Sequence, residues 1–260
     1  MKKTKGFSVV GVVVGILAVG FIAYMSYLVI DGNSKATNFN DYDFHSYIGP
    51  DEHNGNIGDH VKGDKDAPVL IFEYADYQCE HCASINTRVN AAVEKANGKL
   101  GVVYRNFLLS YHQNGTAAAS AALAAGLQEV EGIKDVWKEY SNRLFAAQEE
   151  WYYATASTRT DIFVRIFEEA TDGKGDVDKF REDLASPEVS KRISFDMGIG
   201  KRLEIPGTPT FYVDGQYINW SNSEGGSVVV NGKTVSWDHG LTGSEFTDLL
   251  LEIVDAKTSS

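Results

Sequence analysis

The sequence predicts an α/β fold with an inserted helical domain, preceded by one N-terminal transmembrane helix. Two apolar runs of strand length flank a Cys-x-x-Cys motif, which indicates a buried sheet around that motif. Helical periodicity then continues over about residues 112–202, and strands return near the C-terminus. A long apolar segment at the N-terminus indicates a membrane anchor.

The bulk composition is that of a globular protein. The chain has 260 residues, which is enough for one sizeable domain plus appendages. Hydrophobic residues make up 43% and charged residues 23%, so wholesale disorder is excluded. The formal net charge is −12, and such a surface repels phosphate backbones, so we expect no nucleic-acid partner.

Residues 7–30 carry no formal charge and are expected to span a membrane. A helix of this length crosses a hydrocarbon core of about 30 Å. Three lysines precede the segment and Asp31 follows it, so the positive-inside rule places residues 1–6 in the cytoplasm and the rest outside. The alternative is a cleaved signal peptide, whose apolar region is normally shorter, at about 7–15 residues.

The folded domain is expected to begin after a polar segment. Residues 31–66 are rich in Gly, Asn and Asp and predict a linker or a loosely ordered arm. A strand suited to a buried sheet begins at Ala67. A helix over 80–97 and a second strand over 100–109 complete a βαβ unit.

Apolar residues at helical spacing dominate the region that follows. They predict helices at 116–130, 133–148, 160–171, 176–185 and 186–202. The last of these has a clear start signal in Ser186-Pro187-Glu188, with a capping hydroxyl, a proline and an acid in the first turn. Because these helices lie between two groups of strands, they predict an insertion within the sheet domain.

The C-terminal part predicts two hairpins and a helix. Residues 208–219 form a strand pair that turns at Asp214-Gly215. Residues 220–240 hold a second hairpin with its turn at Asn231-Gly232, and the role of this segment is open. An amphipathic helix over 244–256 ends the domain.

Cys79 and Cys82 are the only cysteines, and their spacing favours redox chemistry. A disulfide that closes so small a loop removes little entropy from the unfolded chain, so a structural staple is excluded. A zinc site needs two further ligands. The histidines outside the motif lack ligand spacing: His45, His53, His60, His112 and His239.

The two thiols are expected to differ because they begin a helix. A helix N-terminus favours an anion and lowers thiol pKa values from about 8.5 to between roughly 3.5 and 7.5. Cys79, nearer the helix start, is the expected nucleophile, and Cys82, one turn further, is the expected buried resolving thiol. His81 would stabilise the Cys79 thiolate, whereas the negative charge of Glu80 would raise its pKa.

Two features outside the motif fit a redox site. Glu73 lies on the strand before the cysteines, where its carboxyl is placed to relay the proton of Cys82; the alternative is a partly exposed acid at a strand end. Pro209 stands at the start of a strand, as a cis proline does, and the backbone of Thr208 would then pair with a bound peptide. The alternative is an ordinary trans-proline loop.

The segments FEYADYQCEHC and EIPGTPTFYVDG resemble the DsbA-like branch of the thioredoxin superfamily, bacterial extracytoplasmic oxidoreductases that form disulfides. The resemblance covers about residues 67–256. It implies a thioredoxin fold with an inserted helical domain, a cis peptide at Thr208-Pro209, and a membrane quinone-linked thiol oxidase that reoxidises the cysteines. Glu80 departs from the proline common in strong oxidants, which leaves the redox potential open.

The leading hypothesis is an anchored oxidoreductase that introduces disulfides into secreted or cell-envelope proteins, with no cofactor and no metal. It would lie in the cell membrane as a single-pass protein with an extracytoplasmic catalytic domain. One alternative is an isomerase or reductase kept reduced by a membrane electron donor. The other is a membrane-tethered metal-binding or assembly module.

Overall fold

A computed structural model describes residues 37–259. The segment expected to span a membrane, residues 7–30, lies outside the described residues. Among the helices of residues 37–259, none combines the length and the apolar character that a membrane crossing requires. The chain divides after Asp41 into two units, and the first of them contains a short 3₁₀ turn, η1 (Phe39–Asp41).

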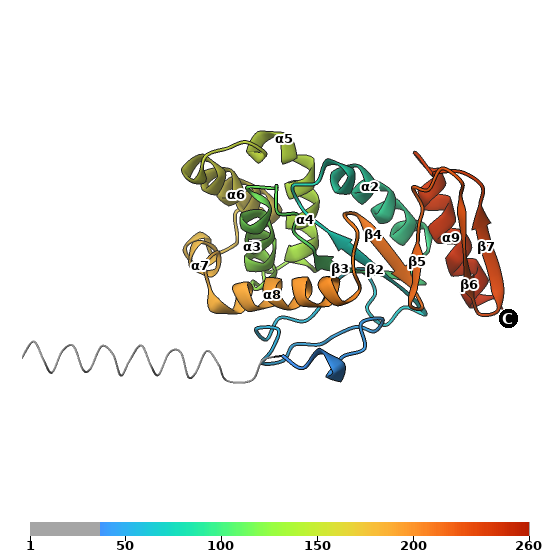
Figure 1. The fold of residues 1–260 in the computed structure, drawn as a ribbon. Coiled ribbons are helices and arrows are strands. Elements are labelled where there is room, and N and C mark those ends of the chain that lie inside the picture. Colours follow the sequence, from blue (N-terminus) through green and yellow to red (C-terminus); the bar gives the residue numbers. More distant parts are fainter. Residues whose placement is uncertain (1–36, 260) are drawn as a thin grey trace, which may run out of the picture. The chain divides into compact units, whose positions relative to one another are not determined.

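A five-stranded mixed sheet forms the centre of residues 42–259 (Figure 1). Its strands follow the spatial order β1-β3-β2-β4-β5. They are β1 (His60–Gly63), β2 (Val69–Ala75), β3 (Leu100–Asn106), β4 (Thr210–Val213) and β5 (Gln216–Ile218). β2 and β3 run parallel, and every other pair is antiparallel. Both parallel strands are buried almost throughout, as their continuous apolar character predicted.

The helices form two groups (Figure 1). α2 (Glu80–Lys95) and α9 (Glu245–Thr258) pack together and against the apolar side chains of the sheet. The inserted helices between β3 and β4 are α3 (Gly115–Gly126), α4 (Val136–Ala146), α5 (Gln148–Trp151), α6 (Ala156–Ala170), α7 (Val177–Asp183) and α8 (Pro187–Arg202). The predicted thioredoxin fold with an inserted helical domain is therefore confirmed.

Local signals placed several element boundaries correctly. Ser186 caps α8, because its hydroxyl accepts a hydrogen bond from the amide of Val189 at 3.2 Å. The turn between β4 and β5 has Asp214 at φ 47° and Gly215 at φ 75°. Such left-handed conformations match the twist of a tight hairpin.

The segment 220–240 forms a two-stranded sheet of β6 (Gly226–Val230) and β7 (Lys233–Trp237). Val228 and Val235 are buried in the cluster that also contains the apolar face of α9. The Gln216 amide on β5 bonds to the carbonyl of Val229 at 2.6 Å and to its N–H at 2.9 Å. This hairpin therefore extends the core beyond β5.

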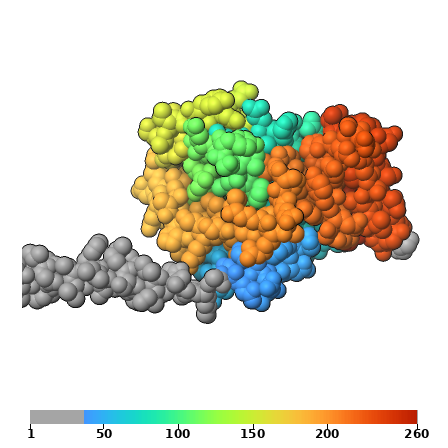
Figure 2. All heavy atoms as spheres, viewed as in Figure 1, coloured from blue at the N-terminus to red at the C-terminus, as the bar shows by residue number. Residues whose placement is uncertain are grey.

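The inserted helices pack directly against the end of the sheet that carries the cysteines. Alanines cover much of α3, and those at 118, 119, 121, 122, 124 and 125 are fully buried. Small side chains let neighbouring helices approach closely, and α3 contacts α4, α6, α7 and α8. Cys79 and Cys82 belong to the same apolar cluster. In the space-filling view, the insertion and the C-terminal part form one continuous surface (Figure 2).

The structure differs from the predicted domain boundary at Ala67. β1 pairs with β3 before that residue, and the segment preceding β1 is tied to the sheet by a buried ion pair. Asp59 accepts hydrogen bonds from Arg105 at 2.8 Å and from Arg192 at 2.6 Å. Burial opposes ionisation of Asp59, but the two guanidinium groups outweigh it and lower its pKa to about 2.

The polar composition of residues 31–66 gave no sign that residues 42–66 are folded. The predicted linker 31–66 is polar, and hydropathy does not distinguish a solvated charge from a buried one that is paired. Arg105 also donates to the carbonyls of Phe44 at 2.6 Å and Ser46 at 3.0 Å, so one strand residue fixes the preceding segment at several points. Residues 42–66 consequently belong to the folded body.

Candidate active site

The Cys-x-x-Cys motif lies where β2 ends and α2 begins. Asp76 forms a tight turn after β2: its carboxylate accepts the amide of Gln78 at 2.9 Å, and its carbonyl accepts the amide of Cys79 at 3.0 Å. Cys79 is the N-cap of α2, and its carbonyl accepts the amide of Ala83 at 3.1 Å. The first sulfur therefore stands among the unpaired amides of a helix N-terminus, as predicted.

The Cys79 thiol is strongly acidic. A hydrogen bond from the side chain of Cys82 lowers its pKa most; burial opposes the change, and the side chain of Thr208 with the amides of Cys82 and His81 lowers it further. The resulting pKa is about 5. At neutral pH the group is therefore a thiolate, the reactive form of cysteine.

Cys82 has the opposite character. Its side chain is fully buried, whereas Cys79 remains 6% exposed. Burial raises the pKa of Cys82 well above its ordinary value, and the neighbouring Cys79 sulfur raises it further. One sulfur is thus ionised near the surface, and the other stays protonated inside.

The loop before β4 lies beside the reactive sulfur. The Thr208–Pro209 peptide bond is cis, as predicted. The carbonyl of Thr208 is 3.4 Å from the Cys79 sulfur and accepts a hydrogen bond from its thiol form. Strand pairing between β2 and β4 extends only to Tyr74 and Thr210, so the cis peptide lies just beyond the sheet.

Glu73 lies on β2 and is fully buried, which excludes the alternative of a partly exposed acid. One oxygen binds the ammonium group of Lys62, on β1, at 2.9 Å, and both side chains are at most 1% exposed. The other oxygen, Oε1, has no hydrogen-bond partner within residues 37–259. The negative charge of Glu73 contributes to the raised pKa of Cys82, which places the two groups within electrostatic reach.

Lys62 was missing from the sequence-based set of site residues. It lies in the polar segment predicted to be a linker, where a lysine is expected to be exposed to solvent. The available signal was Glu73 itself, because a carboxylate on a buried strand requires a cation or a hydrogen-bond donor nearby.

His81 and Glu80 form the exposed first turn of α2. His81 lowers the pKa of Cys79 through its backbone amide. The tuning expected from the two side chains stays a prediction.

Asp76 and His112 form a second pair that sequence reasoning missed. Asp76 is fully buried, and its carboxylate accepts hydrogen bonds from the amide of Leu109 at 2.9 Å and from Nδ1 of His112 at 2.8 Å. Gly115 packs against it so closely that a Cβ would lie 2.8 Å from the carboxylate. The pair joins the turn before Cys79 to the loop after β3.

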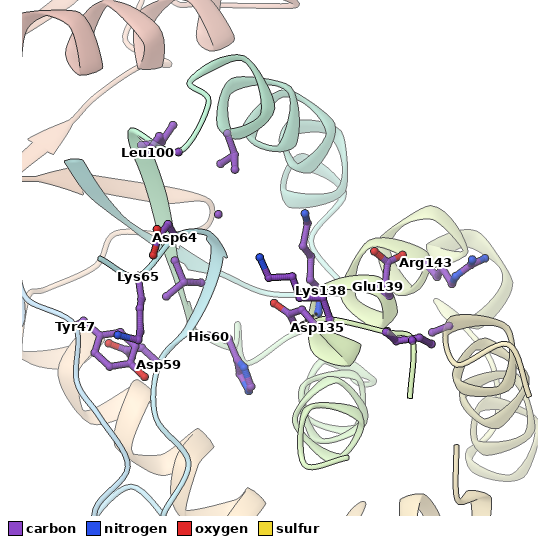
Figure 3. A pocket seen from close by; sticks show the side chains of 18 of the residues that line it. Tyr47, Asp59, His60, Asp64, Lys65, Leu100, Asp135, Lys138, Glu139 and Arg143 are labelled. Atoms are coloured by element: carbon purple, nitrogen blue, oxygen red, sulfur yellow. Dashed lines mark hydrogen bonds between the residues drawn. The ribbon is translucent and has the colours of Figure 1, made fainter. Parts of the chain in front are cut away.

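A broad cavity lies away from the cysteines. It has a volume of about 1080 Å³ and opens between the segment around β1 and helix α4, where Lys65, Asp135, Lys138 and Arg143 line it (Figure 3). None of the predicted site residues contributes to its walls. A smaller hollow of about 440 Å³ lies beside the motif, between Glu80 and Tyr152.

The chain matches a known protein family over most of its length. Residues 55–229 match the family model described as Thioredoxin. The match covers the βαβ unit, the insertion and the strands β4 and β5, and it ends within β6.

Two kinds of curated relatives are similar to this chain. The probable disulfide bond formation protein D of Bacillus cereus is 26% identical over 160 residues, which is 60% of this chain and 70% of that protein. The Na(+)/H(+) antiporter NhaA 3 of Salinispora tropica is 32% identical over 162 residues, which is 61% of this chain. The chain spans only 22% of that antiporter's length.

Solved structures share the fold. BdbD from Bacillus subtilis superposes with a TM-score of 0.51 at 19% identity, covering 68% of this chain and 90% of that one. The α-DsbA1 protein of Wolbachia pipientis superposes with a TM-score of 0.52 at 22% identity, covering 75% of this chain and 90% of that one.

The pKa of Cys79 provides a first test of the site. Replacing Cys82 with alanine removes the hydrogen bond that lowers this pKa most, so the ionisation midpoint should rise from about 5 toward the ordinary value. The ultraviolet absorbance of the thiolate measures the midpoint directly. Cys82→Ser keeps a hydroxyl donor and should retain a lower midpoint than Cys82→Ala; identical titrations of both variants would contradict this assignment.

Proposed function

Because this chain belongs to the thioredoxin family, we propose that it is a thiol–disulfide oxidoreductase that introduces disulfides into secreted or cell-envelope proteins. The observation that carries the proposal is the unequal pair of sulfurs: Cys79 has a pKa of about 5, whereas the buried Cys82 has a raised pKa. The name of the Bacillus cereus relative, a probable disulfide bond formation protein, supports the same activity.

The proposed reaction is two successive thiol–disulfide exchanges. A client thiolate attacks the Cys79 sulfur of the Cys79–Cys82 disulfide, a client–Cys79 bond forms, and Cys82 departs with the electron pair. A second client thiolate then attacks the client sulfur, which releases the client disulfide and the Cys79 thiolate. The client loses two electrons and two protons. The enzyme gains both electrons and one proton, at Cys82, while Cys79 stays a thiolate and the other proton passes to solvent.

The acidity of Cys79 favours this direction. A stabilised thiolate is a better leaving group, so the mixed disulfide breaks readily in favour of the client disulfide. The same stabilisation makes the reduced enzyme easier to reach and its disulfide more oxidising.

We assign proton transfer at Cys82 to Glu73, held by Lys62. The buried sulfur has no direct route to bulk water, and the uncommitted Glu73 oxygen lies in the same interior. Glu73 would deliver a proton when Cys82 departs and accept one when Cys82 attacks a mixed disulfide.

Client recognition is assigned to the cis Thr208–Pro209 loop. This loop lies beyond the last pairing of β4 with β2 and touches the Cys79 sulfur. An extended client segment can pair with the backbone of Thr208 in the manner of an added strand. Such pairing recognises main chain, so it accepts many client sequences.

The proposed location is the cell membrane, with residues 7–30 as a single-pass anchor and the catalytic domain outside. The charge-free segment after three lysines supports this topology. We propose a membrane quinone-linked thiol oxidase as the reoxidising partner, because each turnover leaves the enzyme reduced.

The redox potential tests the proposed direction of electron flow. Equilibration of the protein with glutathione buffers should give a potential well above thioredoxin's, which is about −270 mV. Cys79→Ser should abolish exchange. A value near or below that of thioredoxin would replace the oxidase with a reductase or isomerase. Stoichiometric copper or zinc that Cys79→Ser removes would instead indicate a metal-binding module.

The proton relay predicts a kinetic defect in Glu73→Gln. Release of a preformed mixed disulfide with a client peptide should slow by about tenfold or more, within the range of general acid–base effects. The exposed acid Glu94 on α2 provides the control, and Glu94→Gln should keep the normal rate.

Glu73→Gln also leaves Lys62 as an unpaired buried cation. The double variant Lys62→Met with Glu73→Gln removes that charge, so it should recover stability without recovering the rate. An unchanged release rate in Glu73→Gln would refute the relay.

The anchor is tested by deleting residues 1–30. The full chain should remain with membranes after alkaline carbonate extraction, and the shortened chain should appear in the soluble fraction. Release of the full chain by carbonate would argue against a spanning segment.

A further inference from the structure

The Asp76–His112 pair lies next to the reactive cysteine and has no part in the steps above. Asp76 is fully buried and fixed by two backbone amides in addition to His112. The His112 side chain is 7% exposed, and its Nδ1 lies 2.8 Å from the Asp76 carboxylate. A histidine that is oriented by a buried carboxylate near an active site is suited to act as an acid or a base.

The hydrogen bond to Asp76 determines which ring nitrogen of His112 can act as a base. A carboxylate accepts hydrogen bonds, so Nδ1 must carry the proton that it donates to Asp76. In the neutral ring the lone pair is then on Nε2. Asp76 is the one side chain found to bond the His112 ring within residues 37–259, through Nδ1, and the His112 side chain keeps a small exposed area of 7%.

The same turn holds both His112 and Cys79. The carboxylate of Asp76 binds His112, and its carbonyl binds the amide of Cys79 at 3.0 Å. Tyr152 also lies between the two groups: its ring centroid is 6.5 Å from that of His112, and Tyr152 lines the same hollow as Glu80, the residue after Cys79. His112 is therefore joined, through Asp76, to the turn that carries Cys79.

The proposed exchange needs a base for the client thiol. An ordinary cysteine with a pKa of about 8.5 is only about 3% ionised at pH 7, yet only the thiolate attacks a disulfide. In the oxidised enzyme neither Cys79 nor Cys82 is available to take the proton. Glu73 is fully buried and paired with Lys62, so it is placed for Cys82 rather than for an incoming group.

We propose that Nε2 of His112 is the general base that takes the proton from the incoming client thiol, an inference that rests on the proposed oxidoreductase function. The client S–H bond breaks as its proton moves to Nε2, and the client sulfur bonds to Cys79 while the Cys79–Cys82 bond breaks. Cys82 takes the electron pair. Asp76 stabilises the imidazolium that forms, and His112 then releases its proton to solvent.

The groups around His112 belong to several elements. The titratable ones in contact with its ring are Asp76 before α2, Tyr111 in the same loop, and Tyr152 after α5, and Glu80 at the start of α2 lines a hollow with Tyr152. Arg159 of α6 binds Asn114, two residues from His112. The pH profile of the reaction must therefore be compared between variants rather than assigned to one group.

The test compares two client peptides in single turnovers of the oxidised full-length protein. One carries a cysteine, largely protonated at pH 7, and the other carries selenocysteine at the same position, whose selenol is already ionised at that pH and needs no base. His112→Asn keeps an N–H donor for Asp76 but lacks the base. It should oxidise the cysteine peptide more slowly, by up to about 30-fold because about 3% of the thiol is ionised at pH 7. The selenocysteine peptide should react at the wild-type rate.

The defect with the cysteine peptide should also disappear as the pH rises above the pKa of the peptide thiol. His239→Asn provides the matched control, since this exposed histidine pairs with Asp238 and Glu245 elsewhere on the surface. The ionisation midpoint of Cys79 in the reduced His112→Asn protein should remain about 5, which verifies that the site is intact.

Each other outcome has a definite meaning. Equal slowing of both peptides by His112→Asn would assign the pair a structural role and overturn the proposal. Normal rates with both peptides would overturn it as well. If the wild-type protein oxidised neither peptide, the proposed oxidoreductase function itself would fail, which distinguishes the two conclusions.

Discussion

The buried Asp59 carboxylate, clamped between two guanidinium groups, is the interaction on which the rest of the structure depends. Arg105 belongs to β3 and Arg192 to α8, so one acid joins the sheet, the inserted helices and the segment before β1. A charge buried this deeply destabilises the fold unless it is paired. The requirement for pairing therefore fixes how the insertion sits on the sheet, and with it the walls around the cysteines.

The same requirement organises the site. Glu73 is paired with Lys62, and Asp76 with His112, so two buried acids flank the turn that carries Cys79. The difference between the sulfurs then follows from position along α2: Cys79 caps the helix, whereas Cys82 lies one turn further, against the insertion. The chemistry arises from ordinary burial and hydrogen bonding, with no unusual residue type.

Features encoded locally were predictable from the sequence. The tight turn at Asp214-Gly215 and the start of α8 at Ser186 depend on a few adjacent residues, and both were placed correctly. The cis Thr208–Pro209 peptide and the cysteine pair were likewise predicted, with help from the family resemblance. Partners distant in sequence were missed. Asp59 and Arg105 are 46 positions apart, and Asp76 and His112 are 36 apart, so no pattern along the chain links them.

The complete burial of Cys82 affects how the mixed disulfide between a client and Cys79 is resolved. In the proposed exchange, a client stays covalently attached to Cys79 until its own second thiol or Cys82 attacks. Small thiols in the surrounding medium have no access to the buried Cys82, so they cannot trap that thiol by forming a disulfide with it. Cys82 is therefore kept in reserve inside the protein. A client that presents a second thiol leaves as a disulfide, and a client without one is released when Cys82 attacks the Cys79 sulfur.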